Sequence, residues 1–268
     1  MLTDYTQSQQ KKIATLRPRK ILILGAGREG LSTYKFLRDC FPEKLLTIAD
    51  ANADLPTTDP WREIFAREHA LNRICGSHYL NSLSQFDLVF KTPGIPSQQP
   101  LIAAARDHGT KFTSNMEWFF RLARGKIIGV TGTKGKSTTS SLLSHVFRVN
   151  HVPTLLLGNI GTAPLSYVNQ TTSQTVTVLE LSAHQLQDLT VSPHVAVVQN
   201  ITSEHLDYYA TRESYVAAKS PIVRFQKRRD YYVYCDEFPT CRDFAHLTPA
   251  TKLTYGLKKT PEHQCFIQ

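Results

Sequence analysis

The stretch KIIGVTGTKGKSTT, residues 126–139, places an apolar strand directly before a glycine-rich loop and the start of a helix. In a loop of this kind backbone N–H groups surround phosphates, and Gly132, Gly135, Lys136 and Ser137 are the residue types required. Lys136 would reach the β- and γ-phosphate oxygens, and the Ser137 hydroxyl would face Mg²⁺. The strict pattern has glycine where this chain has Val130. The stretch therefore predicts a variant phosphate-binding loop; the alternative is a glycine-rich turn whose lysine binds nothing.

A second glycine-rich loop lies nearer the N-terminus, in ILILGAGREG at residues 21–30. A buried strand runs into Gly25-x-Gly27-x-x-Gly30, and Asp50 follows Gly30 by 20 residues. This spacing is typical of dinucleotide-binding units, in which a helix N-terminus faces a phosphate. Three interpretations stay open: NAD, another nucleotide in the same crevice, or a tight strand–helix turn without a ligand. The loop thus predicts the position of a site for a phosphorylated ligand, but it does not identify that ligand.

Short apolar runs alternate with amphipathic stretches along the whole chain, which is typical of α/β proteins with largely parallel sheets. We expect a Rossmann-like N-terminal domain followed by a P-loop-type ATPase domain with a mostly parallel sheet. The predicted domains are residues 1–124 and 125–268. The expected strands are Ile21–Leu24, Leu45–Ala49, Leu88–Lys91, Lys126–Val130, Thr154–Leu157, Val176–Leu179, Val195–Gln199 and Tyr231–Tyr234. The expected helices are Glu29–Asp39, Pro100–His108, Met116–Ala123, Lys136–Val149 and Glu213–Phe225.

Composition limits the class of protein. The 268 residues carry a formal net charge of +9, which favours an anionic partner or a solubilising basic surface. No alternation of aromatic and basic residues indicates a nucleic-acid groove. The five cysteines are odd in number and form no CxxC, so we expect neither a disulfide framework nor a zinc site, and a cytoplasmic location. The first twelve residues lack a signal-peptide apolar core, and no stretch is long and apolar enough for a membrane span.

Polar side chains follow several of the later strands. Glu180 closes one strand and is a hard oxygen ligand of the kind that Mg²⁺ prefers beside phosphates. His205 follows another strand, and the residues alone favour the interpretation that it is a structural or a surface histidine. Lys219 lies on an expected helix, where a solvated lysine is the ordinary interpretation.

Five motifs, in order and at the expected approximate spacing, resemble the Mur ligase family: TGTKGKSTT (131–139), GNIG (158–161), LELSAHQL (179–186), QNITSEHLD (199–207) and YVAAK (215–219). Within the family the resemblance is closest to the D-glutamate-adding type, because of GAGREGLS (25–32), KTPGIP (91–96) and SNMEWFF (114–120). The resemblance implies an ATP-dependent, Mg²⁺-assisted amide ligase of peptidoglycan precursor synthesis. Its substrates would be UDP-N-acetylmuramoyl-L-alanine and D-glutamate, joined through an acyl-phosphate.

The resemblance also implies roles for individual residues. Lys136, Lys219 and His205 would be catalytic, and Lys219 matches a lysine that is carbamylated in the family. The ATP phosphates would be held by Gly132, Thr133, Lys134, Gly135, Lys136, Ser137 and Thr138. The metal would be held by Ser137, Glu180, His205 and, if carbamylated, Lys219. The UDP-substrate would be held by Gly27, Arg28, Glu29, Ala51, Asn52, Gly94, Asn159, Ser182 and Gln185.

The chain also departs from the family pattern. Lys134 replaces a common asparagine, and Ala183-His184 stands where a Ser-Phe pair is typical. Only 49 residues follow Lys219, which leaves no room for the family's third, amino-acid-binding domain. We therefore expect a truncated or split ligase, whose missing domain could be encoded separately. The alternative is a non-catalytic remnant that binds the UDP-sugar or ATP.

Overall fold

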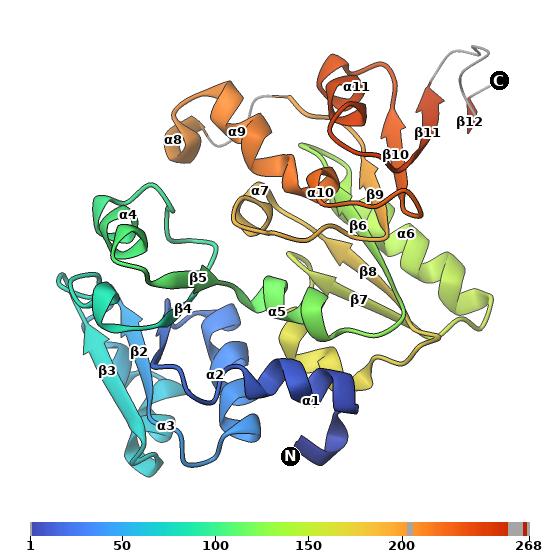
Figure 1. The fold of residues 1–268 in the computed structure, drawn as a ribbon. Coiled ribbons are helices and arrows are strands. Elements are labelled where there is room, and N and C mark those ends of the chain that lie inside the picture. Colours follow the sequence, from blue (N-terminus) through green and yellow to red (C-terminus); the bar gives the residue numbers. More distant parts are fainter. Residues whose placement is uncertain (1, 203–205, 257–264, 267–268) are drawn as a thin grey trace. The chain divides into compact units, whose positions relative to one another are not determined.

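The computed structural model describes residues 2–202, 206–256 and 265–266, which form two compact units (Figure 1). The first unit extends to Leu122 and includes the segment Ala163–Asn169. The second comprises Ala123–Thr162 and the described residues from Gln170 onward. The expected boundary after residue 124 lies close to this division, but the 163–169 segment belongs to the first unit and not, as predicted, to the second.

The first unit contains a five-stranded, wholly parallel sheet in the order β3-β2-β1-β4-β5. Its strands are β1 (Ile21–Leu24), β2 (Leu46–Asp50), β3 (Leu71–Cys75), β4 (Leu88–Lys91) and β5 (Lys111–Thr113). Its helices are α1 (Gln7–Ala14), α2 (Arg28–Cys40), α3 (Trp61–Arg67), α4 (Pro100–Asp107) and α5 (Asn115–Leu122). A 3₁₀ turn, Leu2–Asp4, precedes α1, two more, Leu55–Thr57 and Leu83–Gln85, lie between later elements, and the segment Ala163–Asn169 contributes most of a fourth, Pro164–Gln170. All side chains of β1 and β4 are buried, which explains why β1 is apolar throughout and β4 is apolar up to its last residue, Lys91.

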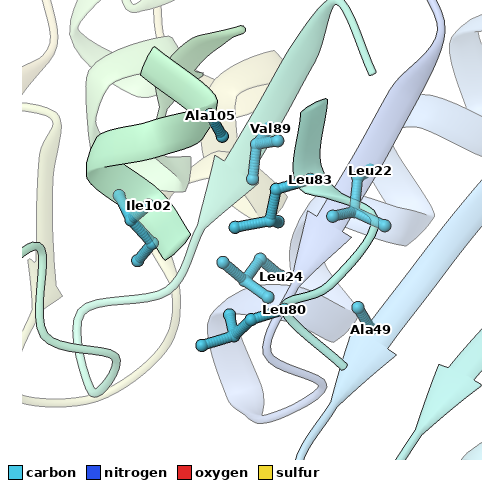
Figure 2. Close-up of a cluster of buried hydrophobic side chains, with 8 residues drawn as sticks. All are labelled: Leu22, Leu24, Ala49, Leu80, Leu83, Val89, Ile102 and Ala105. Carbon is cyan, nitrogen blue, oxygen red and sulfur yellow. The ribbon is translucent and has the colours of Figure 1, made fainter. Parts of the chain in front are cut away.

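One face of this sheet packs against α4 and the turn before β4. Figure 2 shows Leu22 and Leu24 of β1 and Val89 of β4 facing Leu83, with Ile102 of α4 beside them. Leu22, Leu24 and Val89 come from two neighbouring parallel strands, so a one-residue shift of register would expose them. This cluster fixes β1 beside β4, and it thereby fixes the loops that follow both strands.

The second unit contains a seven-stranded sheet in the order β12-β11-β10-β9-β6-β8-β7, and all of its pairings are parallel. Its strands are β6 (Lys126–Thr131), β7 (Thr154–Gly158), β8 (Val176–Glu180), β9 (Val195–Val198), β10 (Tyr231–Cys235), β11 (Thr251–Gly256) and β12 (Cys265–Phe266). Its helices are α6 (Lys136–Val149), α7 (Ala183–Leu186), α8 (Leu206–Tyr209), α9 (Arg212–Lys219), α10 (Pro221–Arg224) and α11 (Pro239–Ala245). The carboxyl ends of β6, β7, β8 and β9 therefore meet at one edge.

The α/β class with parallel sheets is confirmed. The single helix expected over Glu213–Phe225 is wrong: the structure has α9 and α10, which meet at Ser220. Pro221 has no backbone N–H and begins the second helix, so it interrupts the first. No described helix has the length and apolar character needed to cross a membrane.

Candidate functional site

The glycine-rich loop of the second unit connects the carboxyl end of β6 to α6. Gly135 is the N-cap of α6 and has φ +84°, a left-handed conformation that L side chains rarely adopt. Lys136, Ser137 and Thr138 form the first helical turn, and the hydroxyl-bearing Ser137 and Thr138 are exposed. The first backbone N–H groups of a helix have no intrahelical partner and attract anions. The loop therefore offers the donors that a phosphate requires.

Backbone and side-chain hydrogen bonds hold this loop against the segment that follows β9. Thr133 N donates to Asn200 O at 2.7 Å, and Lys134 N donates to Asn200 Oδ1 at 2.9 Å. The Thr133 hydroxyl accepts a hydrogen bond from Thr202 N at 2.9 Å. Lys136 Nζ donates to Thr133 O at 2.9 Å, so this lysine folds back over the loop. The loop conformation is thus fixed by protein contacts.

Glu180 is the last residue of β8 and is almost fully buried, with 1 % of its surface exposed. Its Oε1 accepts a hydrogen bond of 2.7 Å from Asn159 Nδ2, and its carbonyl accepts from Asn159 N. Its Oε2 is buried without a hydrogen-bond partner in the part of the chain that the structure describes. A buried carboxylate oxygen without a hydrogen bond destabilises the folded state unless a cation or a hydrogen-bond donor binds it. The structure thus unites the predicted residues Asn159 and Glu180.

Lys219 is the last residue of α9 and is also buried, at 1 % exposure. Its Nζ donates to Gly132 O at 3.2 Å and to Thr131 Oγ1 at 3.3 Å. The same Nζ lies 4.8 Å from the centroid of the Tyr215 ring, one helical turn earlier. Lys219 therefore contacts the end of β6 and the glycine-rich loop directly, as a solvated lysine on a helix surface would not.

Other predicted residues of this unit have structural partners or lie outside the described residues. Ser182 and Gln185 form a capping box at the start of α7: Gln185 N donates to Ser182 Oγ, and Ser182 N donates to Gln185 Oε1, both at 3.2 Å. His205 lies outside the described residues. In the described part of the chain no three His, Cys, Asp or Glu side chains gather as a metal cluster.

Sequence reasoning did not single out three residues that support this site. Thr131 Oγ1 donates to Leu181 O at 2.7 Å and accepts from Lys219. The Tyr215 hydroxyl lies 3.5 Å from Thr133 Oγ1, and Gln199 Nε2 donates to Thr139 Oγ1. Thr131 is the last residue of β6 and Gln199 directly follows β9, and this position at the carboxyl end of a strand is the one signal that could have indicated them.

In the first unit, the four glycines at the carboxyl ends of β1 and β4 fall into two kinds. A Cβ on Gly25 would lie 2.0 Å from Thr92 Oγ1, and one on Gly30 would lie 1.9 Å from Gly25 O. Packing therefore requires glycine at both positions. A Cβ on Gly27 or Gly94 would meet no atom within 4 Å, and neither has a positive φ. Packing does not explain Gly27 and Gly94, which stand at an open edge where a ligand could approach the backbone.

The remaining predicted residues of the first unit surround this edge. Asp50 accepts hydrogen bonds from Ala26 N at 2.6 Å and Asn52 N at 2.8 Å, which ties the end of β2 to the first glycine loop. Ala51, Asn52 and Arg28 are exposed, and Arg28 begins α2. Glu29 is buried, with its carbonyl accepting from Thr33 Oγ1 at 2.8 Å. The structure thus brings the loops of Gly27, Asn52 and Gly94 to one edge of one sheet.

Comparison with known proteins identifies the family of the chain. A family model described as "Mur ligase middle domain" matches residues 130–267, and one described as "Mur ligase MurD-like, N-terminal domain" matches residues 19–114. The chain therefore belongs to the Mur ligase family, and the predicted resemblance is confirmed. Its relatives include UDP-N-acetylmuramoylalanine–D-glutamate ligases of Ligilactobacillus salivarius, 36 % identical over 83 % of this chain, and of a Geobacillus species, 31 % identical over 96 %. The chain spans about half of their length, 48 % and 56 %.

Solved structures show the same fold. The UDP-N-acetylmuramate:L-alanyl-gamma-D-glutamyl-meso-diaminopimelate ligase from Neisseria meningitides is 17 % identical, with a TM-score of 0.53 over 88 % of this chain and 78 % of that one. A murein peptide ligase from Psychrobacter arcticus is 17 % identical, with a TM-score of 0.51 over 88 % of this chain and 53 % of that one. At this identity the likeness establishes the fold alone.

Proposed function

We propose that this chain acts in the ATP-dependent ligation of D-glutamate to UDP-N-acetylmuramoyl-L-alanine. In this proposal a Rossmann-like domain, residues 1–124, binds the UDP-substrate, and a P-loop-type domain, residues 125–268, binds ATP. The observation that carries the proposal is the meeting of three features at the carboxyl edge of the second sheet. They are the 132–138 loop, the Glu180 carboxylate with its buried Oε2, and the Lys219 ammonium.

The residues at this edge fit a magnesium ion. The Glu180 Oε2 is buried without a partner among the described residues, and a hard cation would satisfy it. Ser137 would supply a hydroxyl oxygen and His205 an imidazole nitrogen. Lys219 would join the set only if carbamylated, a modification that replaces its ammonium group by a carbamate; in the ammonium form it holds the 132–138 loop instead. When bound, Mg²⁺ neutralises the charge of the phosphates and of the substrate carboxylate.

The chemistry that we propose has two steps. An oxygen of the substrate carboxylate attacks the γ-phosphorus of ATP, a new P–O bond forms, the bridging P–O bond breaks and ADP leaves. The amine of D-glutamate then attacks the acyl carbon, phosphate leaves and the amine loses a proton. Lys136 and the backbone N–H groups of residues 132–138 would hold the phosphates in line, since phosphoryl transfer depends mainly on positioning and charge stabilisation.

For the first unit we propose a uridine nucleotide at the edge formed by Gly27, Asn52 and Gly94. The exposed Arg28 at the start of α2 would face the diphosphate, where the helix dipole also favours negative charge. Cytoplasmic location, a separately encoded C-terminal domain and the absence of nucleic-acid binding stay predictions.

The test separates binding from turnover. Calorimetry with the chain alone should detect Mg²⁺-dependent ATP binding and, independently, UDP-N-acetylmuramoyl-L-alanine binding. Phosphate release on addition of D-glutamate is then measured with and without the C-terminal half of the Geobacillus relative. If the chain binds neither ATP nor UDP-N-acetylmuramoyl-L-alanine, the proposal is wrong. Binding of the UDP-substrate without turnover, even with the added half, would favour the remnant, and tight binding of NAD would favour the dinucleotide alternative.

A further inference from the structure

Lys91 is a buried lysine at the end of a strand whose other residues are apolar. It is the last residue of β4, after Leu88, Val89 and Phe90, and is 4 % exposed. Burial of an ammonium group is unfavourable unless strong hydrogen bonds offset the loss of water. A leucine or methionine would fill the same space without the desolvation cost of a charged group. A structural role of the amino group is therefore expected in its hydrogen bonds.

The Lys91 amino group bridges the two ends of the turn that follows its own strand. Its Nζ donates to Ile95 O at 2.8 Å and to Thr92 O at 3.4 Å. Ile95 N also donates to Thr92 O, at 3.3 Å, which closes a four-residue turn over residues 92–95. Hydrogen bonds from a charged donor are stronger than those between neutral groups. Lys91 therefore restrains this turn through hydrogen bonds to the carbonyl groups of its first and last residues.

The restrained turn carries Gly94 at its exposed tip. Thr92 N donates to Leu24 O at 2.9 Å, and the Thr92 side chain occupies the space that a side chain on Gly25 would need. The turn is thus held by two sets of contacts: Thr92 contacts the end of β1 and the first glycine loop, and Lys91 donates hydrogen bonds to the carbonyl groups of the turn. Gly94 itself has no atom within 4 Å of its Cβ position. What Lys91 holds in place is an open stretch of backbone beside the Gly27 loop.

We propose that Lys91 is a positioning residue for the uridine-nucleotide site: it holds the 92–95 turn so that the backbone at Gly94 stays open to the ligand. The inference rests on the proposed function of the first unit. It requires that the hydrogen bonds of Lys91, and not its volume, support binding.

The experiment compares Lys91→Met, which keeps the volume and removes the donors, with Lys91→Gln, which keeps an N–H donor without the charge. Lys111→Met, at an exposed position of β5 in the same sheet, is the matched control. Calorimetry measures the Kd for UDP-N-acetylmuramoyl-L-alanine and for Mg·ATP. Hydrogen exchange follows the amides of residues 94–95, and thermal unfolding reports stability.

We expect Lys91→Met to weaken UDP-substrate binding roughly tenfold to a hundredfold, as for the loss of charge-assisted hydrogen bonds, and to speed exchange at Ile95. Lys91→Gln should recover part of the affinity, and the Kd for Mg·ATP should not change in any variant. If Lys91→Met binds like the wild type, or if Gln and Met weaken binding equally, the inference is wrong. Absence of UDP-substrate binding by the wild type would instead overturn the proposed function of the first unit.

Discussion

The Nζ of Lys219 lies 3.2 Å from the carbonyl oxygen of Gly132, so the end of α9 is hydrogen-bonded to the first glycine of the loop between β6 and α6. The two residues are 87 positions apart. This contact makes a lysine on the helix surface part of the proposed nucleotide site. It also makes the loop conformation depend on a buried ammonium group.

Replacement of Lys219 by methionine should therefore impair the loop. The variant keeps the buried volume but removes the hydrogen bonds to Gly132 O and Thr131 Oγ1. We expect Mg·ATP affinity, measured by calorimetry, to fall at least about tenfold, in line with the loss of charge-assisted hydrogen bonds. Lys126→Met is the matched control, because Lys126 is exposed at the opposite end of β6. Equal affinities in the two variants would contradict a role for Lys219.

Alanine at two glycines of the first loop should separate folding from binding. Gly30→Ala places a Cβ 1.9 Å from Gly25 O, so α2 must move, and we expect a loss of about 2 kcal/mol or more in the free energy of unfolding. Gly27→Ala meets open space and should change stability by less than about 1 kcal/mol. Urea unfolding and UDP-substrate calorimetry of each variant provide the measurement. Gly27→Ala with wild-type affinity would remove Gly27 from the proposed site.

Neutralisation of Glu180 should have opposite effects on stability and on metal dependence. Glu180→Gln keeps the oxygen that accepts from Asn159 and removes a buried negative charge. In the absence of ligand we expect a stability equal to the wild type or higher by about 1–3 kcal/mol. Thermal shift with ATP should lose its dependence on Mg²⁺. A variant that is less stable without ligand, yet retains that dependence, would show that Glu180 is structural.

His194 should make the second unit sensitive to mild acid. Burial is the largest cause that lowers the His194 pKa below its ordinary 6.5; Lys126, Arg229 and Lys227 also lower it, while Asp230 opposes them. Its Nδ1 accepts a hydrogen bond of 3.1 Å from Ile127 N, which requires the neutral ring. As the pH falls, His194 of the unfolded chain therefore binds a proton at a higher pH than His194 of the folded chain. Stability is full above pH 6.5 and falls as the pH drops from 6.5 toward the lowered folded pKa.

Urea unfolding at pH values between 7.5 and 5.5 measures this effect. His194→Asn, which keeps an acceptor but does not titrate, should show a flatter pH dependence over that interval. His145→Asn, at an exposed position on α6, is the control. If His194→Asn and the control have the same slope as the wild type, His194 does not cause the acid sensitivity.

Much of the fold followed from local pattern. The expected strands Ile21–Leu24 and Leu88–Lys91 and the helix Lys136–Val149 coincide with β1, β4 and α6. These segments are buried apolar runs or a helix that begins at a glycine loop, so their signal is strong. Strand β3 was missed because Asn72 and Arg73 are exposed and interrupt its apolar run. Strand β11 was missed because Thr251 and Lys252 are exposed in the same way.

By itself the sequence located most of the strands and the loops after them, and hence that Gly132, Asn159, Glu180 and Asn200 would follow strands of parallel sheets. That order, with the motif residues, was enough to indicate the family. Only the tertiary structure decided which glycines packing requires, that Ser182 and Gln185 cap a helix, and that Lys91 and Lys219 are buried against backbone carbonyls. The physical reason is that local pattern reports which face of an element is apolar. The partner of a polar atom, by contrast, depends on how distant elements pack.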